Sequence, residues 1–325
     1  MKKSIYIILL SSLAIAALGL VACSDDNGAE APTYNVIVDV DKNLFLSGGL
    51  AEPITIVSRT LSDGSTADCY KIVVNNTPSD HTMGPWCPTN ISDDATAGGI
   101  WLEGGEVYDV DGEFIKNLST FYKDNTWMMY DISTGEITKT MSKADCEAAA
   151  NPNVGAEYEN YCVECLPSYL GDMNETYYIP VTPKAASSIK EFGGPGPMSS
   201  GPSVRGIAFN GVRFDAPAPV NAILGAYTLA PFDDAGGHIN LQAGYHYHAA
   251  TGVSTKITQS DGHAPMIGYA LDGYGLFANT DAEGKEYTDL DQARGHYDEV
   301  RGYHYHVDKA GNNNFINGLR GVYAQ

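Results

Sequence analysis

A motif that occurs twice in the C-terminal part constrains the fold of this chain more than any other feature. Each copy reads Gly-His, five residues, then Gly-Tyr-His-Tyr-His, and the copies span residues 237–248 and 295–306. Each motif residue of the second copy follows its counterpart by 58 positions. Seven of the eight histidines lie between positions 238 and 306, so their clustering calls for a common cause.

The alternation within each copy indicates a β-strand. Tyr-His-Tyr-His has a period of two and is rich in aromatic residues, which is typical of strands. Residues two apart on a strand project from the same face, roughly 6.5–7 Å from each other. His246 and His248 are therefore expected on one face, and Tyr245 and Tyr247 on the other. We expect the tyrosines to pack rather than to react.

Histidines at this spacing predict a metal site, because neutral imidazole is the commonest protein ligand for transition metals. Two arrangements are open. Each copy could build its own three-histidine site, or the two His-x-His pairs could face each other and offer up to four nitrogens. The competing interpretation is structural, with each histidine bonded to a carbonyl or a carboxylate. Six histidines at a repeated spacing favour metal binding or catalysis. They are His238, His246, His248, His296, His304 and His306.

Residues between the copies could complete such a site. His263 lies in the turn Asp-Gly-His-Ala-Pro, which would place it between the two motif strands. Asp272 lies in an Asp-Gly turn and is the candidate catalytic residue, as a base on a metal-bound water. It could equally be a metal ligand, orient a ligand histidine or simply form the turn. Asp233, Asp234 and Asp298 are weaker candidates of the same kind. An all-imidazole ligand set favours copper or zinc. Calcium is a further possibility at the Asp-Gly turns.

The repeated Tyr-His-Tyr-His resembles the YHYH-domain proteins, which are named for this tetrapeptide. The likeness includes four further segments: His263 to Gly275, Gly206 to Phe214, Tyr177 to Pro183 and, less closely, Asn75 to His81. It is specific from about residue 177 to 322. The resemblance implies an extracytoplasmic protein but no established reaction. Family members often carry cysteines around the motif, whereas this chain has no cysteine after position 165. We therefore hypothesise that a bound ligand holds its histidine loops.

The first 22 residues are typical of a lipoprotein signal peptide. Lys2 and Lys3 precede an apolar stretch, and Leu-Val-Ala-Cys23 is a lipobox, so lipidation of Cys23 is expected after cleavage. The acidic run 24–27 resembles the surface-export tag of Bacteroidetes lipoproteins, although it could be only a solvated tether. We expect an outer-membrane lipoprotein, periplasmic or surface-exposed, with the surface favoured. The expected divisions are a signal peptide (1–22), a lipidated acidic tether (23–34) and a YHYH domain (35–325) whose motif core is 177–325.

The charge balance excludes several partners. Cleavage would remove two lysines and no acid, which leaves 17 basic against 40 acidic residues and moves the net charge from −21 to −23. Nucleic acid and anionic lipid surfaces are poor partners for so acidic a chain. Cations and small ligands suit it better, and the membrane contact is expected through the lipid on Cys23. Protein partners cannot be read from the sequence.

Composition and turn signals predict a mainly β fold, a β-rich sandwich or barrel-like structure with few short helices. The chain has 21 tyrosines and 35 glycines. Strands are expected at 36–40, 54–57, 70–74, 177–181 and 206–209. A helix is predicted from Ser142 to Ala150, with Ser142 as N-cap and Asp145 three residues on, and another brief helix could begin at 182–187. The Gly/Pro-rich run 193–202 is a loop within one domain or a linker.

The cysteines lie apart from the histidines in the sequence. Five of them (Cys69, Cys87, Cys146, Cys162 and Cys165) remain for thiol chemistry if Cys23 is lipidated. In an exported chain they predict two disulfides and one cysteine left over, with fifteen possible pairings. Cys162 and Cys165 have redox-motif spacing, but no βαβ pattern surrounds them, so a structural role is favoured.

Four classes of function remain. The leading one is a surface lipoprotein that binds a transition metal through the duplicated histidine motifs. The second is a metal-dependent enzyme, a hydrolase with zinc or an oxidoreductase with copper or iron. A metal-free binding or adhesion module is the third. Ser-His-Asp hydrolysis is the weakest, because no Gly-x-Ser-x-Gly motif marks a nucleophile.

Overall fold

The computed structural model describes residues 33–150, 153–193 and 201–325, which belong to one compact unit, Ala31–Gln325. The fold of these residues is mainly β, as predicted, with four short α-helices: α1 (Gly112–Lys116), α2 (Leu118–Phe121), α3 (Lys143–Ala149) and α4 (Val220–Gly225). The expected signal peptide (1–22), Cys23 and most of the expected tether lie outside the described residues, as does most of the run 193–202. No helix in the described part is long and apolar enough to span a membrane.

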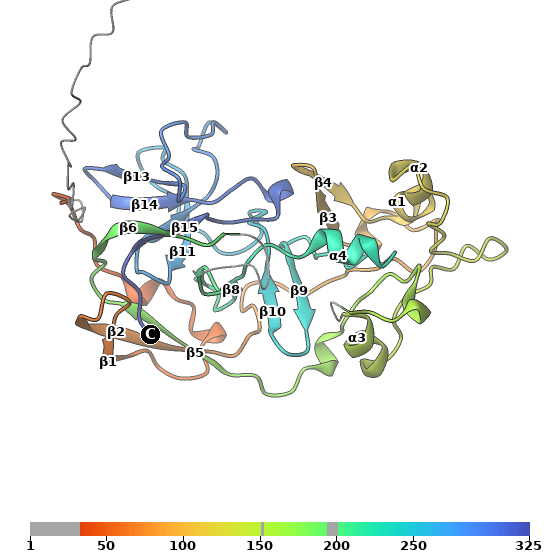
Figure 1. The fold of residues 1–325 in the computed structure, drawn as a ribbon, viewed down its shortest axis with the longest axis horizontal. Coiled ribbons are helices and arrows are strands. Elements are labelled where there is room, and N and C mark those ends of the chain that lie inside the picture. Colours follow the sequence, from red (N-terminus) through yellow and green to blue (C-terminus); the bar gives the residue numbers. More distant parts are fainter. Residues whose placement is uncertain (1–32, 151–152, 194–200) are drawn as a thin grey trace, which may run out of the picture. The chain divides into compact units, whose positions relative to one another are not determined.

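An eight-stranded sheet organises the C-terminal half (Figure 1). Its order is β13-β14-β12-β11-β7-β8-β10-β9. The strands are β7 (Gly206–Ala208), β8 (Arg213–Phe214), β9 (Gly237–Asn240), β10 (Gly244–Tyr247), β11 (Met266–Ala270), β12 (Gly275–Phe277), β13 (Gly295–Asp298) and β14 (Gly302–His306). The two motif hairpins, β9–β10 and β13–β14, therefore form the two opposite edges of the sheet.

The two halves of this sheet have the same pairing pattern. In the first half, β7 pairs antiparallel with β8, β9 pairs antiparallel with β10, and β10 runs parallel to β8. In the second half, β11, β12, β13 and β14 repeat these three pairings in the same order. An antiparallel contact between β7 and β11 joins the halves. Five strand spacings separate β10 from β14, on the order of 24 Å along the sheet.

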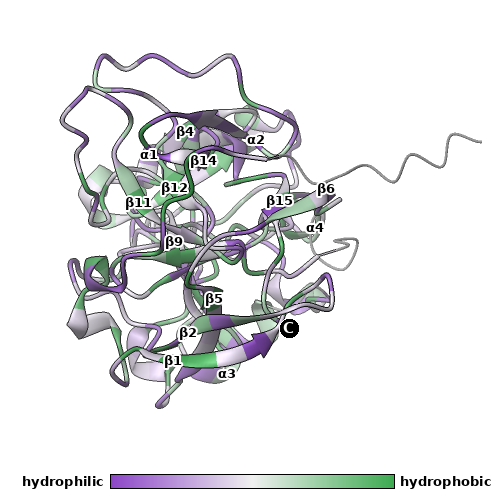
Figure 2. Ribbon diagram, turned by 90° about the vertical axis from the view of Figure 1, so that its left-hand side faces the viewer, coloured by the Kyte–Doolittle hydropathy of each residue, from purple (hydrophilic) through white to green (hydrophobic). Residues whose placement is uncertain are grey.

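Smaller sheets surround the eight strands. β1 (Thr55–Thr60), β2 (Thr66–Val74) and β5 (Glu175–Pro180) form an antiparallel three-stranded sheet. β6 (Ala185–Glu191) pairs with β15 (Gly318–Gly321), and β3 (Ile100–Glu103) with β4 (Glu106–Asp109). Short 3-10 turns lie at Lys42–Leu44, Ser47–Gly49, Ala95–Ala97, Ala156–Tyr158, Pro167–Tyr169 and Ala310–Asn312. Figure 2 shows the strands β11 and β12 as hydrophobic segments of the interior.

Most local sequence signals gave the correct element. The expected strands at 54–57, 70–74, 177–181 and 206–209 lie in β1, β2, β5 and β7, within one or two residues. The helix predicted after Ser142 is α3, and the Ser142 side chain caps it by accepting from the backbone N–H of Asp145. A serine at this position satisfies an N–H that has no partner within the helix.

Two sequence predictions were wrong. Residues 36–40 form no strand, because their backbone bonds go to separate partners: Val36 donates to the hydroxyl of Tyr297 and Val40 to the carbonyl of Val181. The helix suggested at 182–187 does not form: residues 182–184 are irregular, and 185–187 begin β6, because β6 pairs with β15. Sheet pairing with a distant strand overrides weak local propensity.

Two disulfides lie in the region before β5. Cys87 is bonded to Cys162, and Cys146 to Cys165, while Cys69 is a buried free thiol. The predicted count of two bridges and one leftover cysteine is confirmed. Cys162 and Cys165 bond to different partners, so each belongs to a separate structural disulfide. The Cys146–Cys165 bond joins α3 to the segment after Cys162.

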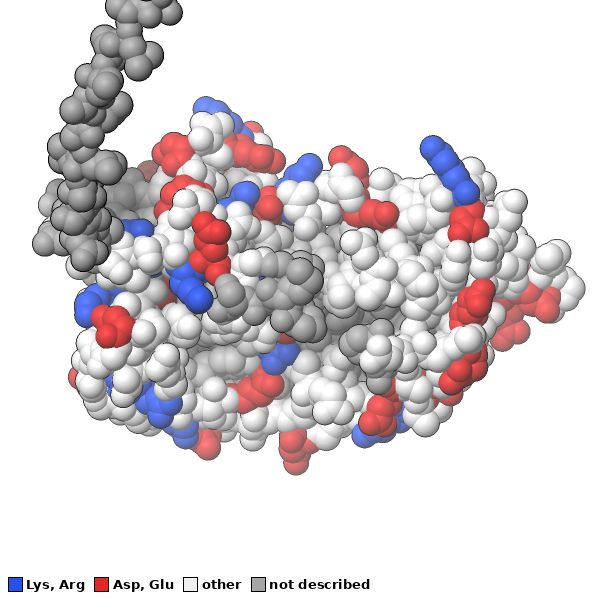
Figure 3. All heavy atoms as spheres, in the orientation of Figure 1, with Lys and Arg blue, Asp and Glu red and all other residues white. Residues whose placement is uncertain are grey.

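The surface carries mainly acidic charge. Figure 3 shows acidic residues spread over the visible face, with basic side chains scattered singly among them. Several of the basic groups are paired, such as Lys184 with Asp63 and Lys71 with Glu52. No broad basic patch interrupts this face.

Candidate metal centres

Both motif copies form antiparallel hairpins with the same register. His246 lies opposite His238 on β9–β10, and His304 lies opposite His296 on β13–β14. A cross-strand pair brings two side chains to the same face, and the histidine two residues further along that strand adds a third. Each copy therefore collects its own three histidines, which is the first of the two arrangements that the sequence allowed.

The glycines of the motif have a steric cause. Gly244 and Gly302 adopt φ values of +70° and +65° where each hairpin enters its second strand, a conformation that favours glycine. Gly237 and Gly295 lie under tyrosine rings: a Cβ there would approach Tyr245 to 2.4 Å and Tyr303 to 2.1 Å. The two glycine positions of the motif are thus the ones at which this hairpin has no room or no suitable backbone conformation for a side chain.

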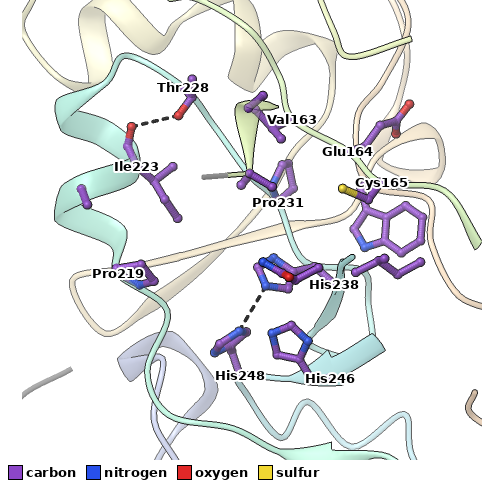
Figure 4. Close-up of a pocket in the computed structure, with 17 residues that line it drawn as sticks. Val163, Glu164, Cys165, Pro219, Ile223, Thr228, Pro231, His238, His246 and His248 are labelled. Carbon is purple, nitrogen blue, oxygen red and sulfur yellow. Dashed lines mark hydrogen bonds between the residues drawn. The ribbon is translucent and has the colours of Figure 1, made fainter. Parts of the chain in front are cut away.

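The first cluster consists of His238, His246 and His248. One ring nitrogen from each lies within 4.8 Å of those of the others, and the Nε2 atoms of His238 and His248 are 3.2 Å apart. Figure 4 shows the three rings gathered at one end of a cavity, with Pro219 and Pro231 nearby. The Nδ1 atoms of His246 and His248 lie 3.0 Å and 2.7 Å from the carbonyl oxygens of Gly244 and Ala216.

The second cluster has four members, because His263 joins His296, His304 and His306. The Nε2 atom of His304 lies 3.0 Å from those of His263 and His296, and the Nε2 atoms of His296 and His306 are 3.2 Å apart. The Nδ1 atoms of His263, His304 and His306 face the carbonyls of Ala264, Gly302 and Ala278. The Nδ1 atom of His296 faces the carboxylate of Asp289.

These partners fix which nitrogen carries the hydrogen in the four rings of the second cluster and in those of His246 and His248. A carbonyl oxygen only accepts, so a neutral imidazole whose Nδ1 faces one must hold its hydrogen on Nδ1 and an unshared electron pair on Nε2. His263 and His304 both meet this condition, yet their Nε2 atoms are only 3.0 Å apart. Two unshared pairs at this distance repel each other unless a cation lies between them. The orientation through Nδ1 is the one typical of metal-ligating histidines.

The spacing of the nitrogens fits a first-row metal. Tetrahedral nitrogens at a Zn–N distance of roughly 2.0–2.1 Å lie roughly 3.3 Å from one another. The observed Nε2 separations of 3.0–3.2 Å are close to this value in both clusters. Both histidine groups could therefore hold a metal ion.

Burial favours the neutral form of several of these imidazoles. It lowers the pKa of His248 and of His304 to about 3, and that of His306 to about 2. The pKa values of His238 and His246 also fall well below 6.5, chiefly because burial penalises the charged ring. Burial lowers the pKa of His263 in the same direction. Neutral imidazole is the form that binds a metal.

The surroundings of the two clusters differ. Aromatic rings flank the second one: Tyr287 stacks on His306 at 3.7 Å between centroids, and the Phe277 ring lies 4.9 Å from those of His263 and His304. The first cluster packs against Phe232 on one side, 5.0 Å from His238. On another side it lines a cavity of about 200 Å³. No such opening was evident from the sequence.

The tyrosines of the motif point to the opposite face and are buried in the main core, as expected of packing residues. Their hydroxyls bond to equivalent partners in the two halves. Tyr245 donates to Asp233, and Tyr303 to Asp291. The hydroxyl of Tyr247 accepts from Asn210, whereas Tyr305 donates to Asp272.

The candidate carboxylates join neither histidine group within the described part of the chain. Asp272 is buried and accepts from the hydroxyl of Tyr305 and from the backbone N–H groups of Tyr274 and Gly321. It therefore lies on the tyrosine face of the second hairpin, opposite the histidines. Burial raises its pKa to about 6. Asp298 accepts from Arg301, and the backbone oxygen of Asp234 accepts from Thr251.

Sequence reasoning did not single out three residues of this region. Asp289 orients His296, Tyr287 covers the second cluster, and His81 contacts the tyrosines of the first hairpin. His81 pairs with Asp80 at 2.7 Å and stacks on Tyr247. None belongs to the repeated motif, and only His81 had a signal in the sequence, as the end of the family-like segment Asn75 to His81.

The model of the YHYH protein family matches residues 176–286. The matched segment runs from β5 to the loop after β12 and contains the first cluster and His263; the second hairpin follows it. The resemblance expected from the tetrapeptides, specific over 177–322, is wider than this match. No curated protein and no solved structure matches the chain.

Proposed function

We propose that this chain, whose residues 176–286 carry a YHYH domain, binds two transition-metal ions, one at each histidine cluster. One observation carries the proposal. In the second cluster, Nε2 atoms of neighbouring histidines converge to 3.0–3.2 Å while their Nδ1 atoms are committed to carbonyl or carboxylate oxygens, and the first cluster repeats the hairpin register with an Nε2 separation of 3.2 Å. Without a cation, these electron pairs would face one another in a buried place.

A purely structural role for the histidines accounts less well for this arrangement. A hydrogen bond between two imidazoles needs a hydrogen on one of the facing nitrogens, and protonated rings would supply it. Burial opposes this solution, because it lowers the pKa of His304 and His306 to about 3 and about 2. A metal ion satisfies all the facing nitrogens of a cluster at once.

The ligand type favours copper or zinc. Imidazole nitrogens suit copper, zinc, nickel and iron, whereas calcium and magnesium prefer oxygen ligands. Neither cluster includes a carboxylate among the described residues. Calcium, which the Asp-Gly turns also allowed, is therefore a poor fit to these two sites.

The location is part of the proposal. The expected lipobox at Cys23 would anchor the chain in the outer membrane, facing the periplasm or the cell surface, with the surface favoured. Two disulfides support an oxidising, extracytoplasmic environment. Replacing Cys23 with serine in cells should abolish labelling with a palmitate analogue, and protease shaving of intact cells distinguishes the two orientations.

Metal content measured by elemental mass spectrometry tests the proposal directly. For residues 24–325 we expect about two equivalents of copper or zinc, falling by one equivalent each in His246→Ala and His304→Ala and by both in the double variant. His81→Asn is the matched control, because this histidine lies on the tyrosine face and joins neither cluster. Circular dichroism establishes that the variants are folded. Absence of metal in the folded parent after incubation with excess ions would refute the proposal.

A metal-dependent enzyme is the second candidate, and one observation favours it. Three protein ligands beside a cavity resemble a catalytic site, since such sites keep one coordination position open, while four-ligand sites are typically structural. Turnover on ester, phosphoester and phenol panels by the metal-loaded chain would support it, provided that His246→Ala abolishes the activity and His304→Ala does not.

A further inference from the structure

We propose that the first cluster keeps one coordination position that opens into the adjoining cavity, and that a small, uncharged, mainly apolar molecule with a single aromatic ring and one donor atom binds there. This inference rests on the proposed metal binding and deepens it. It assigns ligand binding to the first cluster alone and leaves the second as a closed site.

The number of ligands separates the two clusters. Three histidines make up the first cluster and four make up the second. The second contains His263, contributed by the loop before β11, so four imidazoles complete a tetrahedral shell. The chain has no histidine between His81 and His238, so the loop before β7 brings none to the first cluster.

The cavity adjoins the first cluster on a side that its three histidines share. All three histidines line it, and so do Ile239 of β9 and Ile223 of α4 (Figure 4). Its volume is about 200 Å³. An apolar cavity of roughly 150 Å³ is enough to bind benzene. One ring with a short substituent therefore fits, whereas two fused rings would crowd the walls.

The lining determines the chemical class of the ligand. Most of it is apolar, including Val163, Pro219 and Pro231, with Trp86 at the wall. The one carboxylate that lines it is already paired: Glu164 lies 2.8 Å from Lys139 and accepts from the backbone of Cys87. The hydroxyl of Thr228 donates to Ile223, and the neutral amide of Asn240 accepts from the backbone of Gln242. With no free charge to receive a charged ligand, the cavity favours an uncharged ring whose one donor atom meets the metal.

Ligand titration of the Co(II)-loaded chain tests this inference. The probe is 1-methylimidazole, one ring with one available nitrogen, and the size control is 1-(naphthylmethyl)imidazole, which has the same donor on a two-ring group. We expect 1-methylimidazole to shift the visible Co(II) bands at one equivalent per chain and the larger compound to bind at least tenfold more weakly. The response should vanish in His246→Ala, which keeps the metal at the second cluster.

A pair of variants on α4 tests the role of the cavity without touching a histidine. Ala222 lines the cavity and is exposed, whereas its neighbour Asn221 is exposed and does not line it. Ala222→Trp should weaken 1-methylimidazole binding at least tenfold, and Asn221→Trp should leave it unchanged.

The outcomes separate this inference from the proposal on which it rests. Metal content is measured before each titration. Failure of the first cluster to take up metal refutes metal binding there, and with it the inference. A loaded first cluster that shows no spectral change, or that binds the large and the small probe equally, overturns only the inference, as would equal effects of the two tryptophan variants.

Discussion

The two halves of the eight-stranded sheet repeat one local design in different surroundings. Both hairpins place three histidines on one face through the same register. The second half adds His263 and packs Tyr287 and Phe277 against its cluster, while the first half leaves its cluster beside a cavity. The comparison teaches that the hairpin determines which histidines meet, whereas the neighbouring loops determine whether the resulting site is open or closed.

The tyrosine faces of the two halves differ at one equivalent position. Asn210 and Asp272 follow β7 and β11 at the same distance along the chain, and each bonds to the second tyrosine of its motif. The amide of Asn210 donates to Tyr247, whereas the carboxylate of Asp272 accepts from Tyr305. The second half thus buries an ionisable group where the first has a neutral one.

The largest effect is expected from the disulfide that supports the open site. The double change Cys146→Ser/Cys165→Ser removes the bond between α3 and the segment that lines the cavity. It should lower the free energy of unfolding by about 3 kcal/mol, measured by urea denaturation. Binding of 1-methylimidazole at the first cluster should weaken while the metal at the second is retained. Equal losses at both clusters would show that the halves are not independent.

Asp272→Asn should make the second half resemble the first and remove one source of the pH dependence of folding stability. Burial raises the pKa of Asp272 from 3.8 to about 6, so the folded state holds this proton more tightly than the unfolded chain. Protonation of Asp272 therefore contributes up to about 3 kcal/mol to the free energy of unfolding. This contribution is fully present below pH 4 and is lost as the pH rises through 6. Stability measured from pH 4 to 7 should fall less steeply in the variant, and Asn210→Ala serves as the comparison in the first half.

Gly237→Ala and Gly295→Ala test whether the two hairpins tolerate the same change. A Cβ at either position meets a tyrosine ring or hydroxyl at under 2.5 Å, so backbone or ring must shift. Overpacking of this kind costs about 2 kcal/mol. Each variant should weaken metal binding only in its own half, as followed by metal content and thermal unfolding. A variant as stable as the parent would contradict the steric explanation of the motif.

The smallest effect is expected from Asp289→Asn. Asp289 orients His296 at 2.9 Å, and its side chain is largely exposed. Loss of such an orienting group lowers metal affinity by about tenfold. Competition with a coloured chelator measures this change at the second cluster, and the affinity of the first cluster should stay constant. A decrease at both clusters would argue for a general change of charge instead.

Much of the fold followed from local signals. Alternating Tyr-His placed tyrosines and histidines on opposite faces, Ser142 marked the start of α3, and the cysteine count gave two disulfides. These features depend on neighbouring residues or on counting, so a single sequence contains them. Residues 36–40 and 182–187 were misassigned because their hydrogen bonds go to partners far away in the chain.

The sequence alone indicated that the two histidines of each His-x-His pair share one face of a strand, because the strand period is two; it left open whether each motif copy builds its own site. The tertiary structure decided the rest. It brought His263 to the second cluster, separated Asp272 from the histidines, selected one of fifteen cysteine pairings and left a cavity beside the first cluster. Each of these depends on how loops from distant parts of the chain pack, and the free energy of that packing is not encoded in any short stretch of residues.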